Sequence, residues 1–297
     1  MQTDNSRGIL LMAASMLAFA VEDMFIKFAA ADMPTGQILL VFSLIGTPAF
    51  ALIARTQGHA VLTRAVLHPA VIRRNVGEVI GSAGFITALA LTPMTSAIAI
   101  FQAAPLVMTM GAAWFLGERV GWRRWSAIIA GFLGVLLVIR PGTDAFQVAS
   151  LFSVVAVLGL CLRDLASRRV PATVSSAQLS TWAYSAMGLL GIAMLFGSGG
   201  AVIPTIGQGL NVLAATALGF VGYWMVTEAS RLGEVAVITP FRYLRLIFAM
   251  IIGLTVFGER PDALTFVGAG IIVASGLYTV LRERRLRRTL SPKAVTR

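Results

Sequence analysis

The chain has 297 residues, of which 57% are hydrophobic and only 12% are charged. So few polar side chains cannot cover a soluble globule of this length, which excludes a water-soluble protein and predicts one that spans a membrane. The formal net charge of +11 would suit a nucleic-acid partner, but the basic residues gather in alternate loops as in membrane proteins, so we expect no nucleic acid.

Continuous apolar runs recur along the whole chain, and crossing a bilayer takes roughly 20 such residues. The polar, proline and glycine breaks between the runs predict ten transmembrane helices, and hence an all-α integral membrane protein. In chain order the predicted helices are 7–31, 34–55, 73–92, 95–117, 122–140, 148–169, 174–197, 208–230, 234–258 and 262–282. The first run lacks a signal-peptide cleavage pattern and is read as a retained helix.

The segments outside these helices differ in charge and length. Most of the 24 Lys and Arg residues lie in alternate loops and in the tail, which predicts that both termini are cytoplasmic. The longest loop, 56–72, contains both histidines and is read as an amphipathic surface segment rather than a metal site. The basic tail, 285–297, either contacts anionic headgroups or only anchors the topology. Cys161 is the single cysteine, which excludes disulfide and cysteine-metal frameworks.

The chain repeats itself at an offset of 141 residues. The matched residues are Asp23 with Asp164, Lys27 with Arg168, Gln37 with Gln178, and Gly117-Glu118-Arg119 with Gly258-Glu259-Arg260. We therefore predict two five-helix repeats, 1–142 and 143–284, followed by the tail. Because five is odd, the second repeat enters the membrane from the opposite face, and inverted repeats around a central cavity suit alternating access.

Ionisable residues inside the predicted spans are the first candidates for the cavity, because a charge in hydrocarbon costs at least about 2.5–3.5 kcal/mol. These candidates are Glu22, Asp23, Glu78, Arg163, Asp164, Glu228, Arg242 and Arg245. The spacing of four residues predicts structural pairs between Asp23 and Lys27 and between Asp164 and Arg168.

Arg242 and Arg245 lie three residues apart, without an acid close in sequence. Their guanidinium groups are therefore predicted to clamp a substrate carboxylate. The alternative is that Glu78 or Glu228 neutralises them.

Polar or aromatic side chains near these charges complete the candidate substrate-binding set. They are Ser82, Phe101, Gln102, Tyr223, Trp224 and Tyr243. Pro105 predicts a kink in the fourth helix, because proline removes a backbone donor. Gly77, Gly81 and Gly84 predict close helix packing rather than ligand contact.

The Gly-Glu-Arg sequence that closes the fourth helix of each half, together with the duplicated five-helix pattern, resembles the EamA-type carriers of the drug/metabolite transporter superfamily. Bacterial exporters of amino acids, including aromatic ones, are the most similar branch. The resemblance implies a cavity built from helices three, four, eight and nine with help from one and six, and export without ATP. Glu118 and Glu259 are read as structural, ordering the turns with Arg119 and Arg260.

We accordingly expect a secondary transporter of the bacterial inner membrane that exports amino acids or similar small zwitterionic metabolites by alternating access. The alternative is a proton-coupled exporter of cationic drugs that uses a membrane carboxylate such as Glu22. Enzyme motifs such as HExxH, GxSxG and GxxxxGK[ST] are missing from the sequence. We therefore expect no enzyme, no cofactor, no metal and no ATP-binding subunit, with the substrate and membrane lipid as the partners.

Overall fold

The computed structural model describes residues 4–118, 120–232 and 234–290, and every regular element within these ranges is a helix. The first half contains α1 (Asn5–Ala30), α2 (Thr35–Thr56), η1 (Arg64–Leu67), α3 (Pro69–Leu91), α4 (Met94–Phe101), α5 (Ala104–Leu116) and α6 (Trp122–Ile139). The second half contains η2 (Val148–Ser150), α7 (Leu151–Ser167), α8 (Ser176–Gly197), α9 (Ile206–Leu232), α10 (Val235–Ile238), η3 (Thr239–Tyr243), α11 (Leu244–Thr255) and α12 (Ala263–Leu290).

The all-α fold with its predicted spans is confirmed, with one refinement in each half. Eight helical segments of the described chain are long and apolar enough to cross a membrane, and α4 and α5 together form one of them. The two further predicted spans are α3 and the segment from α10 through α11. The fourth and ninth predicted helices are thus each broken near their middle.

The two breaks fall at matching positions of the halves. α4 ends at Phe101 and α5 starts at Ala104, with Pro105 in its first turn. In the second half a 3-10 segment, η3, separates α10 from α11, with Pro240 in its first turn. A proline has no N–H to donate to the preceding turn, so it fits best in the first turn of a helix. The kink predicted from Pro105 is seen as an interruption of the α-helix at Gln102 and Ala103.

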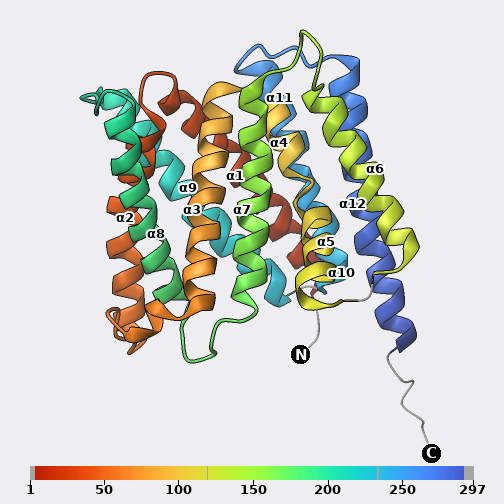
Figure 1. Ribbon diagram of the computed structural model, residues 1–297, viewed down its shortest axis with the longest axis horizontal. Coiled ribbons are helices and arrows are strands. Elements are labelled where there is room, and N and C mark those ends of the chain that lie inside the picture. The colour runs from red at the N-terminus through yellow and green to blue at the C-terminus, as the bar shows by residue number, and fades with distance from the viewer. Residues whose placement is uncertain (1–3, 119, 233, 291–297) are drawn as a thin grey trace, which may run out of the picture.

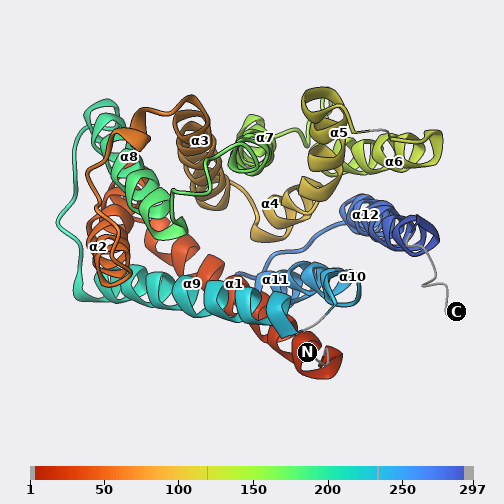
Figure 2. The same cartoon turned by 90° about the horizontal axis from the view of Figure 1, so that it is seen from below.

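Most helices run roughly in one direction in Figure 1, whereas α9 crosses the bundle obliquely, as Figure 2 shows, and both described ends of the chain reach the same face of the molecule. We call this the terminal face and the other the opposite face. Viewed along the bundle, α3 and α7 lie on one side and α1 and α9 on the other (Figure 2). The pairs α2–α8 and α6–α12 close the two ends. The repeat offset exchanges the α1–α9 contact with the α7–α3 contact and maps each end pair onto itself.

Glycines bring these helix pairs into backbone contact. A Cβ on Gly159 of α7 would lie 2.4 Å from the backbone nitrogen of Gly81 on α3, so no larger residue fits at this crossing. Gly36 and Gly191 meet in the same way between α2 and α8. Close approach of small residues is the usual means of helix association in lipid. The packing role predicted for the α3 glycines is what the structure shows.

The predicted loop 56–72 is shorter than expected, because α3 begins at Pro69. The imidazole Nδ1 of His68 accepts a hydrogen bond from the backbone N–H of Ala70 at 3.2 Å and caps this helix. The indole of Trp182 on α8 donates to the carbonyl of Val61 at 2.9 Å, which ties the loop to the bundle. The described residues contain no cluster of metal-ligating side chains. Most of the basic tail lies outside the described residues.

Candidate functional site

A central cavity of about 360 Å³ lies between the two sides of the bundle. Its polar and aromatic lining is Phe19, Glu22, Asp23, Phe42, Glu78, Ser82, Phe85, Phe101, Arg163, Tyr184, Tyr223, Arg242 and Arg245. An adjoining cavity of about 580 Å³ shares Glu22, Glu78, Arg163 and Tyr184 and extends to Pro171 on the α7–α8 connection. That connection lies on the terminal face (Figure 1), so the two cavities together lead from this face to the middle of the bundle.

The helices implied by the family resemblance supply most of this lining. Two further helices contribute: α2 provides Phe42, and α8 provides Tyr184. Tyr184 stacks on Phe50 of α2, with ring centroids 5.4 Å apart. These aromatic residues had no charged neighbour in sequence, which is why the sequence analysis did not select them.

Asp23 and Arg245 form a two-bond ion pair at the centre of the site. The Arg245 guanidinium donates from Nη2 to Oδ1 at 2.7 Å and from Nε to Oδ2 at 3.0 Å. The Asp23 side chain is fully buried. The pairing contradicts the prediction that Asp23 would neutralise Lys27. It also means that Arg245 already holds a carboxylate of the protein, so it is not free to clamp one from a substrate.

Three aromatic rings surround the Arg245 guanidinium. Its Cζ lies 5.2 Å from the ring centroids of Phe19 and Phe85 and 5.4 Å from that of Phe101. Cation–π attraction of this kind becomes stronger where water is excluded. The three rings come from α1, α3 and α4, so Arg245 joins both halves of the chain.

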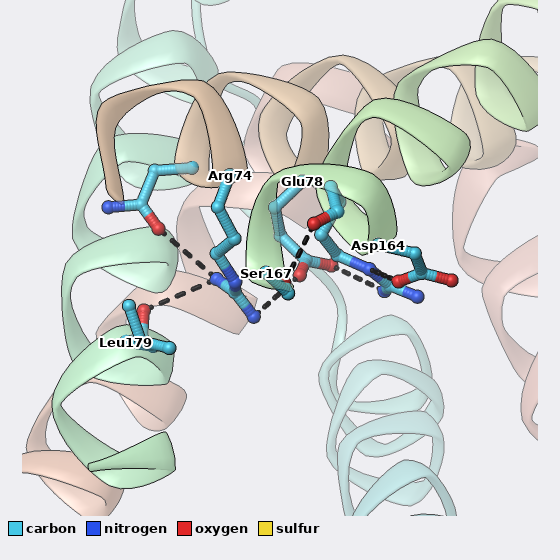
Figure 3. Close-up of polar contacts among 7 residues, drawn as sticks. Arg74, Glu78, Asp164, Ser167 and Leu179 are labelled. Atoms are coloured by element: carbon cyan, nitrogen blue, oxygen red, sulfur yellow. Dashed lines mark hydrogen bonds and ion pairs between the residues drawn. The ribbon is translucent and has the colours of Figure 1, made fainter. Parts of the chain in front are cut away.

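A second set of ion pairs links α3 to α7 (Figure 3). Glu78 accepts from Arg74 at 3.0 Å and from Arg163 at 3.3 Å, and Arg163 also donates to Asp164 at 2.7 Å. Arg74 further donates to the carbonyl of Leu179 on α8 at 3.3 Å. Two acids and two bases therefore balance one another, and Glu78 is not available to neutralise Arg242 or Arg245.

Arg74 is a cavity residue that the sequence analysis missed. It is the second residue of the predicted helix 73–92, at the membrane surface, where a basic residue indicates topology rather than a site. The structure starts α3 four residues earlier and places Arg74 in the adjoining cavity. Its spacing of four residues before Glu78 was the available signal, since such residues face each other on a helix.

Lys27 and Arg168 also pair differently from the prediction. Lys27 lies 3.9 Å from Glu259, and Arg168 donates to Glu118 at 2.7 Å. Each cation therefore pairs with the Gly-Glu-Arg motif of the other half, because the packing of α1 and α7 points these side chains between the halves. Glu259 also accepts from the backbone N–H of Met94 at 2.5 Å. The predicted partner of Glu118, residue 119, lies outside the described residues.

Two cavity charges of opposite sign remain without an ion-pair partner among the described residues, and they are Glu22 and Arg242. Arg242 is exposed to the cavity, at the broken segment η3. The Glu22 carboxylate is half-buried and faces Gly219 of α9, where a side chain would collide with it. The balanced pairs elsewhere thus leave one positive and one negative group for a ligand.

Four candidates of the sequence analysis do not appear in the lining of the two cavities: Gln102, Trp224, Glu228 and Tyr243. Gln102 is buried and donates to the carbonyl of Arg242 at 3.4 Å, so it supports the break that presents Arg242. Tyr243 is buried against Gly276 of α12. The Trp224 side chain is 61% exposed on the outer surface of α9. Tyr223, its neighbour, faces the cavity.

Comparison with known families matches both halves of the chain. Residues 6–140 and residues 147–281 each correspond to the family described as the EamA-like transporter family. A crystal structure with 16% sequence identity superposes with a TM-score of 0.62 and covers 94% of this chain and 98% of its own. At that identity the match supports the fold alone.

Several curated proteins are similar over most of their length. A riboflavin transporter of Rhizobium johnstonii is 28% identical over 73% of this chain and 72% of its own. An S-adenosylmethionine uptake transporter of Rickettsia bellii is 25% identical over 66% and 67%, respectively. The pseudopaline exporter CntI of Pseudomonas aeruginosa is 27% identical over 90% and 94%.

Proposed function

The chain belongs to the EamA-like transporter family, and we propose that it exports amino acids or similar small zwitterionic metabolites by alternating access. Its relatives are named for riboflavin, S-adenosylmethionine and pseudopaline, so the shared property is transport of a small molecule. The names include both uptake and export. We propose export rather than uptake because the pseudopaline exporter, whose similarity covers 90% of this chain, is named for export.

The observation that carries the proposal is the pair of unpaired charges in one cavity. Arg242 offers a planar, permanently charged fork that suits a carboxylate. Glu22 offers a carboxylate that suits an ammonium group or another cation. The other lining charges described above are matched within the protein, so a zwitterion would satisfy both groups and leave the cavity neutral.

The aromatic lining supports a substrate with an apolar or aromatic part. Phe19, Phe85 and Phe101 surround Arg245, and Tyr184 and Tyr223 face the same space. Rings of this kind provide apolar contact area, and the tyrosines add hydroxyl groups for hydrogen bonds. A volume of about 360 Å³ is within the range of small-molecule pockets.

We further propose that the terminal face is cytoplasmic and that the membrane is the bacterial inner membrane. Arg73, Arg123, Arg168 and Arg169 all lie near this face, in agreement with the excess of positive charge on the cytoplasmic side of membrane proteins. The cavity then opens toward the compartment from which an exporter takes its substrate.

Counterflow in proteoliposomes tests the proposal. The protein is reconstituted with unlabelled amino acids inside, and exchange of labelled aromatic, aliphatic and cationic amino acids is measured for the native chain, Arg242→Gln and Arg123→Gln. We expect Arg242→Gln to lower the apparent affinity for amino acids by roughly 10–100-fold, the range for a lost charge-assisted contact of about 1.5–3 kcal/mol. Arg123→Gln, on the terminal face, should transport like the native chain. Equal exchange by Arg242→Gln and the native chain would disprove the role of Arg242.

A proton-coupled exporter of cationic drugs is the second candidate, and the unpaired Glu22 favours it. A cation without a carboxylate needs Glu22 but not Arg242. Loss of cation efflux in Glu22→Gln, combined with normal efflux in Arg242→Gln and dependence on an imposed pH gradient, would select this candidate over the zwitterion exporter.

A further inference from the structure

An apolar groove of about 380 Å³ lies on the outside of the bundle, between α3, α5 and α7 and apart from the central cavity. Its wall is formed by Val107, Met110, Trp114, Leu158, Leu162 and Leu165. The exposed fraction of Trp114 is 63% and that of Leu158 is 51%, so the groove opens on the lipid-facing surface. An apolar groove of this kind in a membrane accepts an acyl chain.

Two arginines, Arg73 and Arg169, also line this groove. Arg73 lies in the first turns of α3 and Arg169 is the second residue after α7, so both are at the terminal face. Among the described residues, both side chains donate only to backbone carbonyls: Arg73 Nε to Pro69 at 3.1 Å, and Arg169 Nη2 to Phe115 at 2.7 Å. No carboxylate of the described residues lies within ion-pair distance of either guanidinium group, and both keep donors for a further anion.

We propose that this groove binds one anionic phospholipid from the leaflet at the terminal face. One acyl chain lies against Met110 and Leu162, and the headgroup phosphate accepts hydrogen bonds from Arg73 and Arg169. Basic pockets between transmembrane helices recognise anionic headgroups in this way, and the guanidinium fork matches phosphate oxygens. The charge of the rim selects the headgroup, while the apolar wall holds the chain.

The other half of the molecule provides an internal comparison. At the repeat offset, Arg73 corresponds to Ala214 and Arg169 to Phe28, so neither matched residue is a cation. Gly111, which lines the groove, corresponds to Ile252, whose buried side chain takes up space there. The groove and its charge therefore occur at only one of the two repeat-related locations and at one leaflet, and do not follow from the shared architecture of the repeats.

The bound lipid would contact both halves of the chain, because α3 and α5 come from the first half and α7 from the second. A ligand that binds one arrangement of two moving parts more tightly stabilises that arrangement. We therefore expect the lipid to stabilise the conformation seen here, in which α5 lies against α7.

Lipid retention by the full chain tests the proposal. The protein is purified in neutral detergent, and binding of phosphatidylglycerol and phosphatidylcholine is measured by native mass spectrometry and by thermal unfolding. We expect phosphatidylglycerol to be retained more strongly and to raise the unfolding temperature more. Arg73→Gln/Arg169→Gln should weaken its retention roughly tenfold or more, since each basic group near a membrane contributes about a fivefold factor. The lysine pair, Arg73→Lys/Arg169→Lys, should keep most of the preference.

Two matched variants separate this site from general attraction of lipid to a basic face. Arg55→Gln/Arg123→Gln removes two exposed arginines that do not line the groove, and it should keep phosphatidylglycerol binding. Met110→Trp fills the groove and should weaken binding while leaving both arginines in place. Because it changes no charge, this variant carries the test if the glutamine pair does not fold. Equal retention of the two lipids would overturn the proposal. So would an equal loss of phosphatidylglycerol binding in Arg73→Gln/Arg169→Gln and Arg55→Gln/Arg123→Gln, or unchanged binding by Met110→Trp.

Discussion

Lys27 and Glu259 join the first helix of one half to the Gly-Glu-Arg motif of the other, with Nζ and Oε1 3.9 Å apart. Lys27 also donates to the carbonyls of Leu89 and Thr92, at 3.1 Å and 2.6 Å. Glu259 meanwhile accepts from the N–H groups at the start of α4. One ion pair thus fastens α1, the α3–α4 connection and the end of α11 together at the opposite face.

The repeat-related pair, Arg168 and Glu118, occupies the terminal face and differs in burial. Its two side chains are each 49% exposed, whereas those of Lys27 and Glu259 are 18% and 9% exposed. Exposed pairs contribute about 0–1 kcal/mol, while breaking a buried pair leaves an uncompensated charge. The opposite face is therefore fastened more firmly than the terminal face, toward which the cavities lead.

Glu259→Gln should loosen the opposite face, because it removes the charge that holds Lys27. In a Cys161→Ser background with Ser82→Cys in the cavity, we expect a membrane-impermeant thiol reagent added from the opposite face to label residue 82 several-fold faster. Glu118→Gln is the matched control and should leave that rate nearly unchanged. Equal acceleration by both substitutions would contradict the role assigned to burial.

Asp23→Asn should destabilise the protein, because Arg245 would keep its charge in a buried site without a partner. Removal of one member of a buried pair costs about 3–5 kcal/mol, which we expect as a lower unfolding temperature in detergent. The double variant Asp23→Asn/Arg245→Met should recover much of the loss. Glu22→Gln is the control, since Glu22 has no ion-pair partner among the described residues, and it should unfold close to the native temperature.

Gly159→Ala should weaken the packing of α3 on α7. The added methyl group would lie 2.4 Å from the backbone nitrogen of Gly81, so the helices must separate. Overpacking of this kind costs about 1–3 kcal/mol. Gly209→Ala on α9 is the control, because nothing lies within 4 Å of its added Cβ. Thermal unfolding should show a loss for Gly159→Ala only, and equal stability of the two variants would exclude tight packing at Gly159.

Asp262, which precedes α12 at the opposite face, should stabilise the fold down to unusually low pH. Hydrogen bonds from the Arg140 guanidinium, followed by those from Thr265, hold the pKa of the Asp262 carboxyl below its usual value. A carboxyl group whose pKa is lower in the folded than in the unfolded protein stabilises the fold. This stabilisation is fully present above the unfolded pKa of about 3.9 and is lost as the pH falls toward the folded pKa. The unfolding-temperature difference between the native chain and Asp262→Asn should stay constant from pH 7 to about pH 4 and shrink below that. A difference that already disappears near pH 6 would contradict the lowered pKa.

The sequence by itself determined the membrane-spanning fold class, since a transmembrane helix satisfies its backbone hydrogen bonds within one segment. The apolar length of each span is therefore a local property of the sequence, and the predicted spans and the kink at Pro105 follow from local residues. The position of ionisable groups inside spans is local in the same sense, so the sequence alone identifies Glu22, Arg242 and Arg245 as intramembrane charges.

Only the tertiary structure decided which of these groups pair. Asp23 meets Arg245, 222 residues away in the chain, rather than Lys27 one turn further along its own helix. Such pairing depends on how each helix is rotated and tilted, and contacts such as that of Gly81 with Gly159 set those angles across distant segments. Most of the charged side chains in the cavity lining form ion pairs with one another. The same packing therefore also decided that Glu22 and Arg242 face the cavity without ion-pair partners among the described residues.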